Sequence, residues 1–334
     1  MSTVMGVAGP IEADHLGRTL VHEHIVITYP GEELDRSRTW KRADTVAVAI
    51  DRMAELLDAG FRTFVDPCPI ELGRDPELYA EIAQRTGMQI VCTTGFYTEH
   101  NGIGLPVYWR ARDPEEIAEL YVSELVDGIG GTGIRPGAIK AATGVEVTAA
   151  ERRALSGAAL AHRETGAAII THTEHSQNGA VQQEVFAEYD ADPARILIGH
   201  QDEEADLDGL RTLVKGGTFV GVDRIGLEML APDSRRADHV AALVLEGFAA
   251  QVCLSQDHVC TLTAPRSAYW VPPERRTVAP EVRAAIKWQV SGRPYTYLLT
   301  DFVPMLVERG VTADQVEIML VDNPRQLLTG CRRP

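Results

Sequence analysis

Short runs of apolar and β-branched residues alternate with longer segments of helical periodicity along most of this 334-residue chain. A strand followed by a helix and then by another strand is typical of a βα unit, and such units place their strands parallel in one sheet. The sequence predicts eight strands, at 19–27, 61–66, 88–95, 137–142, 167–173, 195–200, 218–223 and 251–257. Eight units without a linker predict an α/β fold, a single (β/α)8 TIM barrel over residues 1–334, with its active site at the C-terminal strand ends.

Several helix starts carry a recognisable signal. Asp44 is expected to cap the helix that follows the first strand. Asp75 and Asp113 each precede a proline, which suits the first helical turn, and Thr148 with Glu151 forms a capping box. Further helices are predicted at 206–215, 235–249, 297–309 and 312–320.

The connection after the eighth predicted strand, residues 258–294, is unusually long. It contains Trp270, the Pro272–Pro273 pair and Trp288, and only a short helix around 280–289 is predicted within it. Long connections with little secondary structure are often functional lids, so we expect this loop to border the active site. A surface excursion without function is the alternative.

Composition excludes some classes of protein. The chain has 32 Lys and Arg against 48 Asp and Glu, a net charge of −16, which argues against a general binder of nucleic acid or acidic membranes. No stretch approaches the roughly 18 apolar residues of a membrane helix. The first ten residues show no secretory signal, so a cytoplasmic location is expected. Five cysteines without C-x-x-C spacing are expected to be reduced thiols, most of them in the core.

Ionisable residues gather at the predicted C-terminal ends of the strands. These residues are His22, His24, Lys140, His172, His200 and Asp257. Side chains two residues apart on a strand face the same side, so His22 and His24 would reach one ion while Glu23 points away. Four histidines and an aspartate at one mouth are hard to explain as core packing, because each buried imidazole needs a partner. The pattern therefore predicts a metal site.

Lys140 needs its own explanation in such a site. Two divalent cations nearby would lower the pKa of its amine and leave it neutral. A neutral amine can react with carbon dioxide, and the resulting carbamate can bridge two metal ions. Two other interpretations are a lysine that extends its charge to the surface and a Schiff-base lysine of an aldolase-type barrel.

Motifs in this order resemble the phosphotriesterase family of the amidohydrolase superfamily. They are LVHEH at 20–24, IK at 139–140, THT at 171–173, IGH at 198–200, GVDR at 221–224, SQD at 255–257 and LVDNPR at 320–325. The resemblance covers about residues 9–328 and is stronger to the phosphotriesterase-like lactonases than to the phosphotriesterases proper. It implies that His22, His24 and Asp257 hold the more buried metal. His172 and His200 would hold the more exposed one, with carboxylated Lys140 and a hydroxide bridging the two.

Two residues carry the lactonase resemblance. Tyr97 in GFY and Arg224 in GVDR match residues that in lactonases lie over the metal centre and order the substrate region. The alternatives are core packing for Tyr97 and a structural ion pair for Arg224. Glu203 stands where most family members have an aspartate that helps to relay a proton, and Asp202 is either its substitute or a neighbour.

The resemblance therefore implies a metal-dependent hydrolase that opens acyl-homoserine lactones or other γ- or δ-lactones. A metal-bridging hydroxide would attack, Asp257 would accept its proton, and Tyr97 would lie near the leaving alkoxide. Zinc is the expected metal, with iron, cobalt and manganese as alternatives. Promiscuous phosphotriester hydrolysis is compatible with the same centre.

Other functions stay open at this point. A dedicated organophosphate triesterase and an amide hydrolase would use the same centre, whereas a Schiff-base aldolase would use Lys140 alone. A metal-dependent binding protein is the non-enzymatic alternative. The expected partner is a small-molecule lactone or ester, without nucleic acid or membrane, and the resemblance implies a homodimer.

Overall fold

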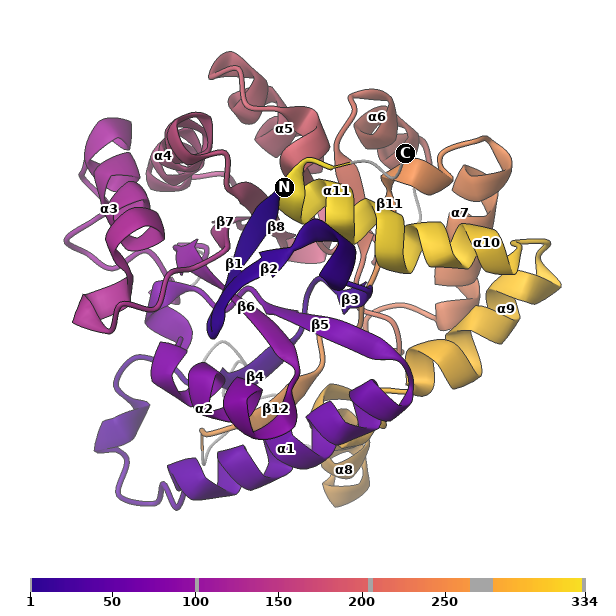
Figure 1. The fold of residues 1–334 in the computed structure, drawn as a ribbon, viewed down its shortest axis with the longest axis horizontal. Helices are drawn as coiled ribbons and strands as arrows, with labels where there is room; N and C mark the ends of the chain where they lie inside the picture. Colours follow the sequence, from indigo (N-terminus) through magenta and orange to yellow (C-terminus); the bar gives the residue numbers. More distant parts are fainter. Residues whose placement is uncertain (1, 100–101, 204–206, 265–278, 332–334) are drawn as a thin grey trace.

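Eight parallel strands form a nearly closed barrel in the computed structural model, which describes residues 2–99, 102–203, 207–264 and 279–331 (Figure 1). The order of the strands around the sheet is β11-β10-β9-β8-β7-β6-β5-β3. In chain order they are β3 (Arg18–Leu20), β5 (Phe61–Asp66), β6 (Gln89–Gly95), β7 (Ala138–Thr143), β8 (Ala168–Thr173), β9 (Ile196–Ile198), β10 (Phe219–Val222) and β11 (Val252–Leu254). The predicted TIM barrel is confirmed.

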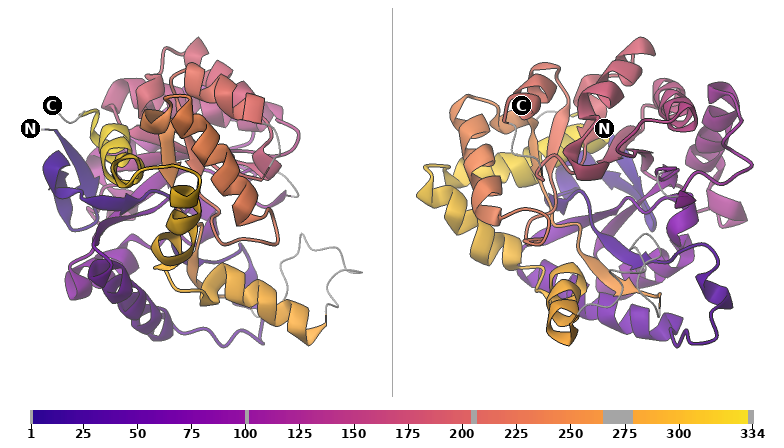
Figure 2. Two further views of the ribbon diagram at one scale, coloured as in Figure 1. Left: turned by 90° about the vertical axis from the view of Figure 1, so that its right-hand side faces the viewer. Right: turned by 180° about the vertical axis from the view of Figure 1, so that it is seen from behind.

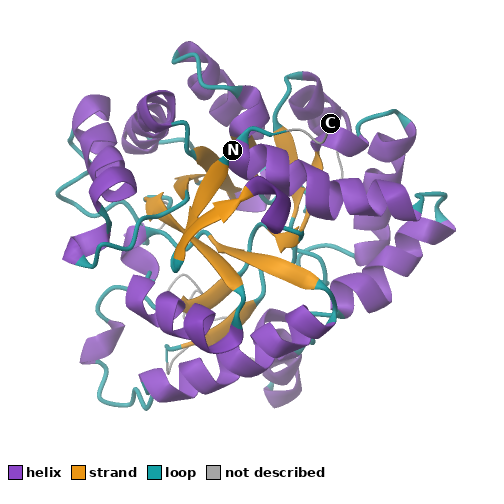
Figure 3. Ribbon diagram, in the orientation of Figure 1, coloured by secondary structure: helices purple, strands orange, loops and turns teal. Residues whose placement is uncertain are grey.

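Helices surround the strands on the outside of the barrel (Figure 3). They are α1 (Arg42–Asp58), α2 (Pro76–Thr86), α3 (Pro114–Asp127), α4 (Ala149–Thr165), α5 (Gly179–Glu188), α6 (Leu207–Lys215), α7 (Asp233–Leu245), α8 (Pro280–Lys287), α9 (Val303–Glu308), α10 (Ala313–Glu317) and α11 (Asn323–Thr329). Buried side chains fill the space between helices and strands, and a second buried cluster that includes Val65, Val91 and Ile170 fills the barrel interior. The barrel is therefore a packed core, and the site lies at its rim.

Three of the four predicted helix caps are confirmed. Asp75 and Asp113 occupy the N-cap positions of α2 and α3, and Thr148 begins the capping box of α4. Asp44 does not cap α1, because that helix already begins at Arg42. The aspartate lies in the first turn instead, where its charge still favours the positive end of the helix dipole.

The first predicted strand is interrupted, so the prediction of one strand over 19–27 was wrong. β3 pairs with β5, whereas β4 (His24–Ile27) pairs with β12 (Val259–Leu262), and residues 21–23 belong to neither strand. Within this break the His22 amide donates to Ser255 Oγ over 3.0 Å, and the Asp257 amide donates to the His22 carbonyl over 3.1 Å. The break is where the chain changes partners and the barrel closes.

Strands six, seven and eight end earlier than the sequence predicts. β9, β10 and β11 stop at Ile198, Val222 and Leu254, so the candidate residues lie in the turns just beyond. His200 and Asp257 have φ values of 56° and 47°, a left-handed conformation that does not occur within a strand.

Elements outside the eight βα units were not predicted. β1 (Thr3–Gly6) and β2 (Gly9–Glu12) form an antiparallel hairpin at the N-terminal ends of the strands, where the Val7 amide donates to the Ile90 carbonyl over 2.8 Å.

Near the chain's end, π-helical turns precede α9 and α11, at Leu298–Phe302 and Ile318–Asp322. The predicted helices at 297–309 and 312–320 are therefore present in altered form.

The long connection after β11 holds β12 and α8. The helix predicted around 280–289 is confirmed by α8, which stands away from the barrel with every residue exposed (Figure 2). Trp270 and the Pro272–Pro273 pair lie outside the described residues, as does residue 206 of the predicted helix 206–215. Across the described ranges, no helix combines the length and apolar character needed to cross a membrane.

Candidate metal centre

The side chains singled out as metal ligands converge at the C-terminal mouth of the barrel. His22 Nε2 lies 3.3 Å from Lys140 Nζ, and His24 Nε2 lies 3.3 Å from Asp257 Oδ1. His200 Nε2 lies 3.9 Å from Asp257 Oδ2, and the His172 ring centre is 4.6 Å from that of His200. These residues are far apart in sequence, and the ends of parallel strands bring them together.

Asp223 orients two of the histidines. Its carboxylate accepts hydrogen bonds from Nδ1 of His22 over 3.0 Å and from Nδ1 of His200 over 2.9 Å. The proton on each ring therefore resides on Nδ1, and the lone pair of each Nε2 points toward the centre. Sequence reasoning noted Asp223 only within the GVDR motif and missed this role, although its place at the end of β10 was a usable signal.

A second carboxylate lies behind His24. Nδ1 of His24 is 3.4 Å from Oδ1 of Asp66. The Asp66 carboxylate accepts hydrogen bonds from the amides of Ile25 and Cys68 over 2.8 and 2.9 Å. This contact turns Nε2 of His24 toward Asp257. The sequence analysis did not identify Asp66, which ends β5.

Burial keeps most of these imidazoles neutral. It lowers the pKa of His22 and of His172 to about 4, and the pKa of His200 well below its usual value. His24 differs, because the neighbouring carboxylates of Asp257 and Asp66 outweigh the effect of burial and raise its pKa. Neutral imidazole is the form that binds metal ions, so the charge state of three rings suits a ligand role.

Lys140 is a buried residue, 1% exposed. The interpretation as a surface lysine was therefore wrong. Burial lowers the pKa of its amine to about 8, so a minor fraction is neutral near physiological pH, more than at the usual pKa of a lysine. Its position beside His22 places a reactive amine within the donor set.

Asp257 stays ionised despite its burial. The neighbouring His200, His24 and Arg224 hold the pKa of this carboxyl well below its usual range, against the effect of desolvation. Imidazole nitrogen together with carboxylate oxygen is a donor set that divalent ions such as zinc prefer. The residues present therefore fit a metal centre.

Tyr97 and Arg224 lie at this cluster. The Tyr97 hydroxyl is 3.4 Å from His172 Nε2, whereas its neighbour Phe96 belongs to the hydrophobic core. Arg224 donates from Nε to Asp257 Oδ2 over 3.0 Å and also forms an ion pair with Glu203. Burial raises the pKa of Tyr97 well above its usual value, so its hydroxyl stays protonated.

The two acidic residues after His200 have different surroundings. Glu203 pairs with Arg224 and lies 3.1 Å from His175 Nδ1. Asp202 instead accepts hydrogen bonds from the Arg236 side chain over 2.8 Å and from the Arg224 amide over 3.0 Å. Asp202 therefore supports the backbone of Arg224, and Glu203 supports its guanidinium.

Glu174 was missed from the sequence. Its Oε2 lies 3.2 Å from His172 Nε2, two residues along the same segment, and its side chain is 26% exposed at the mouth. The hydrogen bond with His172, together with the positive charge of Arg224, lowers the pKa of Glu174 to about 2. Glu174 directly follows the THT motif, and this position could have indicated from the sequence that it lies near the metal centre.

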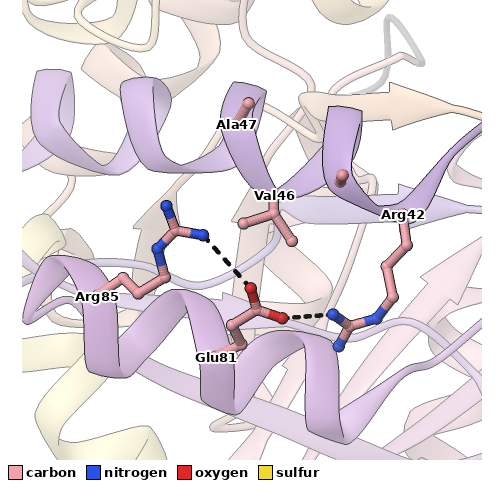
Figure 4. Close-up of a pocket in the computed structure, with 6 residues that line it drawn as sticks. Arg42, Val46, Ala47, Glu81 and Arg85 are labelled. Atoms are coloured by element: carbon pink, nitrogen blue, oxygen red, sulfur yellow. Dashed lines mark hydrogen bonds and ion pairs between the residues drawn. The ribbon is translucent and has the colours of Figure 1, made fainter.

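A pocket on the outer surface is lined only by α1 and α2 (Figure 4). Glu81 lies between Arg42 and Arg85 and forms ion pairs with both. The two guanidinium groups share this carboxylate, and Arg42 also pairs with Asp75 over 3.7 Å. The candidate metal ligands lie at the strand ends, and none of them lines this pocket.

A TIM barrel with imidazoles, a carboxylate and a buried amine at its mouth defines a class of metal-dependent enzymes. The family model for the phosphotriesterase family matches residues 2–328, and the chain belongs to this family, whose members are metal-dependent hydrolases. The chain is 35% identical over 329 residues to the phosphotriesterase homology protein of Mycobacterium tuberculosis, covering 96% of this chain and 95% of the relative.

Solved structures agree with this assignment. The organophosphorus hydrolase from Deinococcus radiodurans has a TM-score of 0.88 and 36% identity, covering 98% of this chain and 97% of that one. Another structure, from the molecular engineering of organophosphate hydrolysis activity from a weak promiscuous lactonase template, has a TM-score of 0.88 and 34% identity, covering 98% and 99%.

Proposed function

We propose that this protein hydrolyses lactones, namely acyl-homoserine lactones or other γ- or δ-lactones, with phosphotriesters as weaker, promiscuous substrates. The observation that carries the proposal is the position of Tyr97 and Arg224, which contact His172 and Asp257 at the mouth. The similarity to a structure derived from a lactonase template supports it.

We propose the following ligands. His22, His24 and Asp257 would hold one divalent ion, His172 and His200 a second, and Lys140 would bridge them after carboxylation. The fixed ring orientation of His22 and His200 and the neutral fraction of the Lys140 amine support this assignment. Zinc suits these donors, as do iron, cobalt and manganese.

These residues would hold two divalent ions, which would supply a water molecule of lowered pKa and polarisation of a substrate carbonyl. Asp257, ionised at neutral pH, would accept the proton of the attacking water. Arg224 holds Oδ2 of Asp257 and so fixes the direction of that carboxylate. The protonated hydroxyl of Tyr97 would donate a hydrogen bond to the ring oxygen as it leaves.

A dedicated organophosphate triesterase is the second candidate, and the likeness to the organophosphorus hydrolase favours it. An amide hydrolase of the same family is a third. Membership in a family of hydrolases argues against the Schiff-base aldolase and the binding protein.

The test compares rates on an acyl-homoserine lactone, a simple δ-lactone and a chromogenic phosphotriester, using protein whose metal content has been counted. We expect two metals per chain, loss of activity with a chelator, and the highest kcat/KM on a lactone. A highest kcat/KM on the phosphotriester would favour the triesterase. Turnover of amides alone would overturn both.

Other features of the protein stay predictions. We propose that residues 1–334 form one domain in which the loop 258–294 shapes the substrate pocket, and that the chain forms a homodimer. Light scattering combined with size-exclusion chromatography measures the oligomeric state. The cytoplasmic location expected from the sequence also stays a prediction.

A further inference from the structure

The carboxyl group of Glu23 is fully buried and accepts three hydrogen bonds from one short segment. Oε1 accepts from Ser255 Oγ over 2.8 Å and from the Gln256 amide over 2.7 Å, and Oε2 accepts from the His258 amide over 2.9 Å. Glu23 lies between His22 and His24 in sequence, but it bonds to the segment after β11. Its carboxylate therefore joins the first and last strands of the barrel.

The donors of these bonds flank Asp257 on both sides. Asp257 itself has a φ of 47°, a strained conformation for a residue other than glycine, which persists only where the surroundings hold it. The strand order has β3 and β11 at its two ends, without a ladder between them. Side-chain bonds of Glu23 thus supplement the few backbone bonds at this closure.

Both backbone and side-chain hydrogen bonds join residues 22–24 to residues 255–258, where the barrel closes. The Asp257 amide donates to the His22 carbonyl over 3.1 Å, and the His24 amide donates to the His258 carbonyl over 2.9 Å. Ser255 Oγ accepts from the His22 amide while it donates to Glu23. The segment that carries two histidines is in this way connected to the segment that carries Asp257.

We propose that Glu23 is a positioning residue that holds Asp257 against the metal centre. The inference rests on the proposed role of Asp257 as a ligand. Both carboxyl oxygens of Glu23 accept hydrogen bonds. Glutamine has one acceptor oxygen, and its NH2 group would face at least one of the three donors, so that hydrogen bond would be lost. Replacement of Glu23 should therefore let the segment around Asp257 move, although every residue proposed as a metal ligand is still present.

The test uses the full-length protein and three variants. Glu23→Gln replaces one of the two acceptor oxygens, and Ser255→Ala removes one donor. Glu124→Gln is the control, because Glu124 lies on α3, away from the centre, and the change disrupts its buried ion pair with Arg74. Competition with a chromophoric chelator measures Co²⁺ and Zn²⁺ affinity, the Co²⁺ absorption spectrum reports the coordination, and hydrogen exchange reports the protection of residues 255–258.

For Glu23→Gln we expect roughly 10- to 100-fold weaker binding of one of the two ions, the range typical of residues that orient ligands. The cobalt spectrum should change, and amides 255–258 should exchange faster. Glu124→Gln should retain both affinities even if its melting temperature falls. A smaller weakening is expected for Ser255→Ala.

Two results would overturn the proposal: wild-type affinity for both ions in a folded Glu23→Gln protein, or equal weakening in Glu124→Gln. If Glu23→Gln does not fold, Ser255→Ala decides, and wild-type affinity in that variant overturns the proposal. Absence of metal binding by the wild-type protein would instead contradict the proposed function.

Discussion

Arg224 donates a hydrogen bond from Nε to Oδ2 of Asp257 over 3.0 Å, which joins the end of β10 to the segment after β11. The same guanidinium pairs with Glu203, while its backbone amide donates to Asp202. Arg224 is therefore held by Glu203 and Asp202 and in turn holds Asp257. This arrangement explains how a residue outside the proposed ligand set can control a ligand's direction.

Arg224→Ala should lower lactone kcat/KM without removing the metals. A hydrogen bond to a charged group contributes about 1.5–3 kcal/mol, which corresponds to roughly 10- to 100-fold in rate. Arg224→Lys should rescue little, because one ammonium cannot reproduce the two directions of the guanidinium. Steady-state kinetics with metal counts measure both effects, and full activity in Arg224→Ala would contradict the proposed role.

Asp223→Asn should weaken metal binding. An asparagine has one acceptor oxygen, so it can satisfy Nδ1 of His22 or of His200 but not both, and one ring loses its fixed orientation. Affinity should fall by roughly 10- to 100-fold, as is usual for the partners of ligating histidines. Chelator competition provides the measurement, and Glu124→Gln again serves as the control. An unchanged affinity would show that the rings are oriented without Asp223.

Lys140→Ala should lose both metal occupancy and turnover, because the proposed bridge between the ions would be missing. A short carboxylic acid such as propionate could occupy the space of the side chain and supply the missing oxygens. We therefore expect partial recovery of activity and metal content as propionate is added. Full activity of a folded Lys140→Ala protein without any added acid would exclude the bridging role.

The arrangement of the barrel and the clustering of the metal-binding residues could be predicted from local patterns. Buried parallel strands require continuous apolar runs, as in β9 and β10, and ionisable residues at strand ends have few structural explanations. His172 and Lys140 were identifiable for this reason. The helix α5 was missed, because Gln182 is buried among its few apolar positions and weakens the helical pattern.

The supporting contacts could not be predicted, because each depends on distant parts of the chain. Asp223 lies 201 residues from His22, and Ser255 lies 232 residues from Glu23. No local pattern indicates which carboxylate faces which ring. The break at 21–23 has the same origin, since it depends on Ser255 and Asp257, which reach the first strand only when the barrel closes.

His162, near the C-terminal end of α4, gives the fold a testable pH dependence. Its Nδ1 donates to the Ala167 carbonyl over 2.7 Å, and its Nε2 accepts from the Asp192 amide over 3.1 Å. Only the neutral ring can make both bonds. Burial lowers the pKa of His162 below its usual value of 6.5, so the unfolded chain binds a proton more readily than the folded one.

The stabilisation by His162 should be complete above about pH 6.5 and decrease as the pH falls below that value. At pH 7.5, His162→Gln should lower the free energy of unfolding by about 1–3 kcal/mol, the usual cost of leaving buried partners unpaired. The difference from wild type should shrink by up to about 1.4 kcal/mol per pH unit toward pH 5. Urea unfolding followed by circular dichroism measures this, with His15→Gln, a change of an exposed imidazole, as the control. A difference that stays constant from pH 7.5 to 5 would show that protonation of His162 does not contribute to acid unfolding.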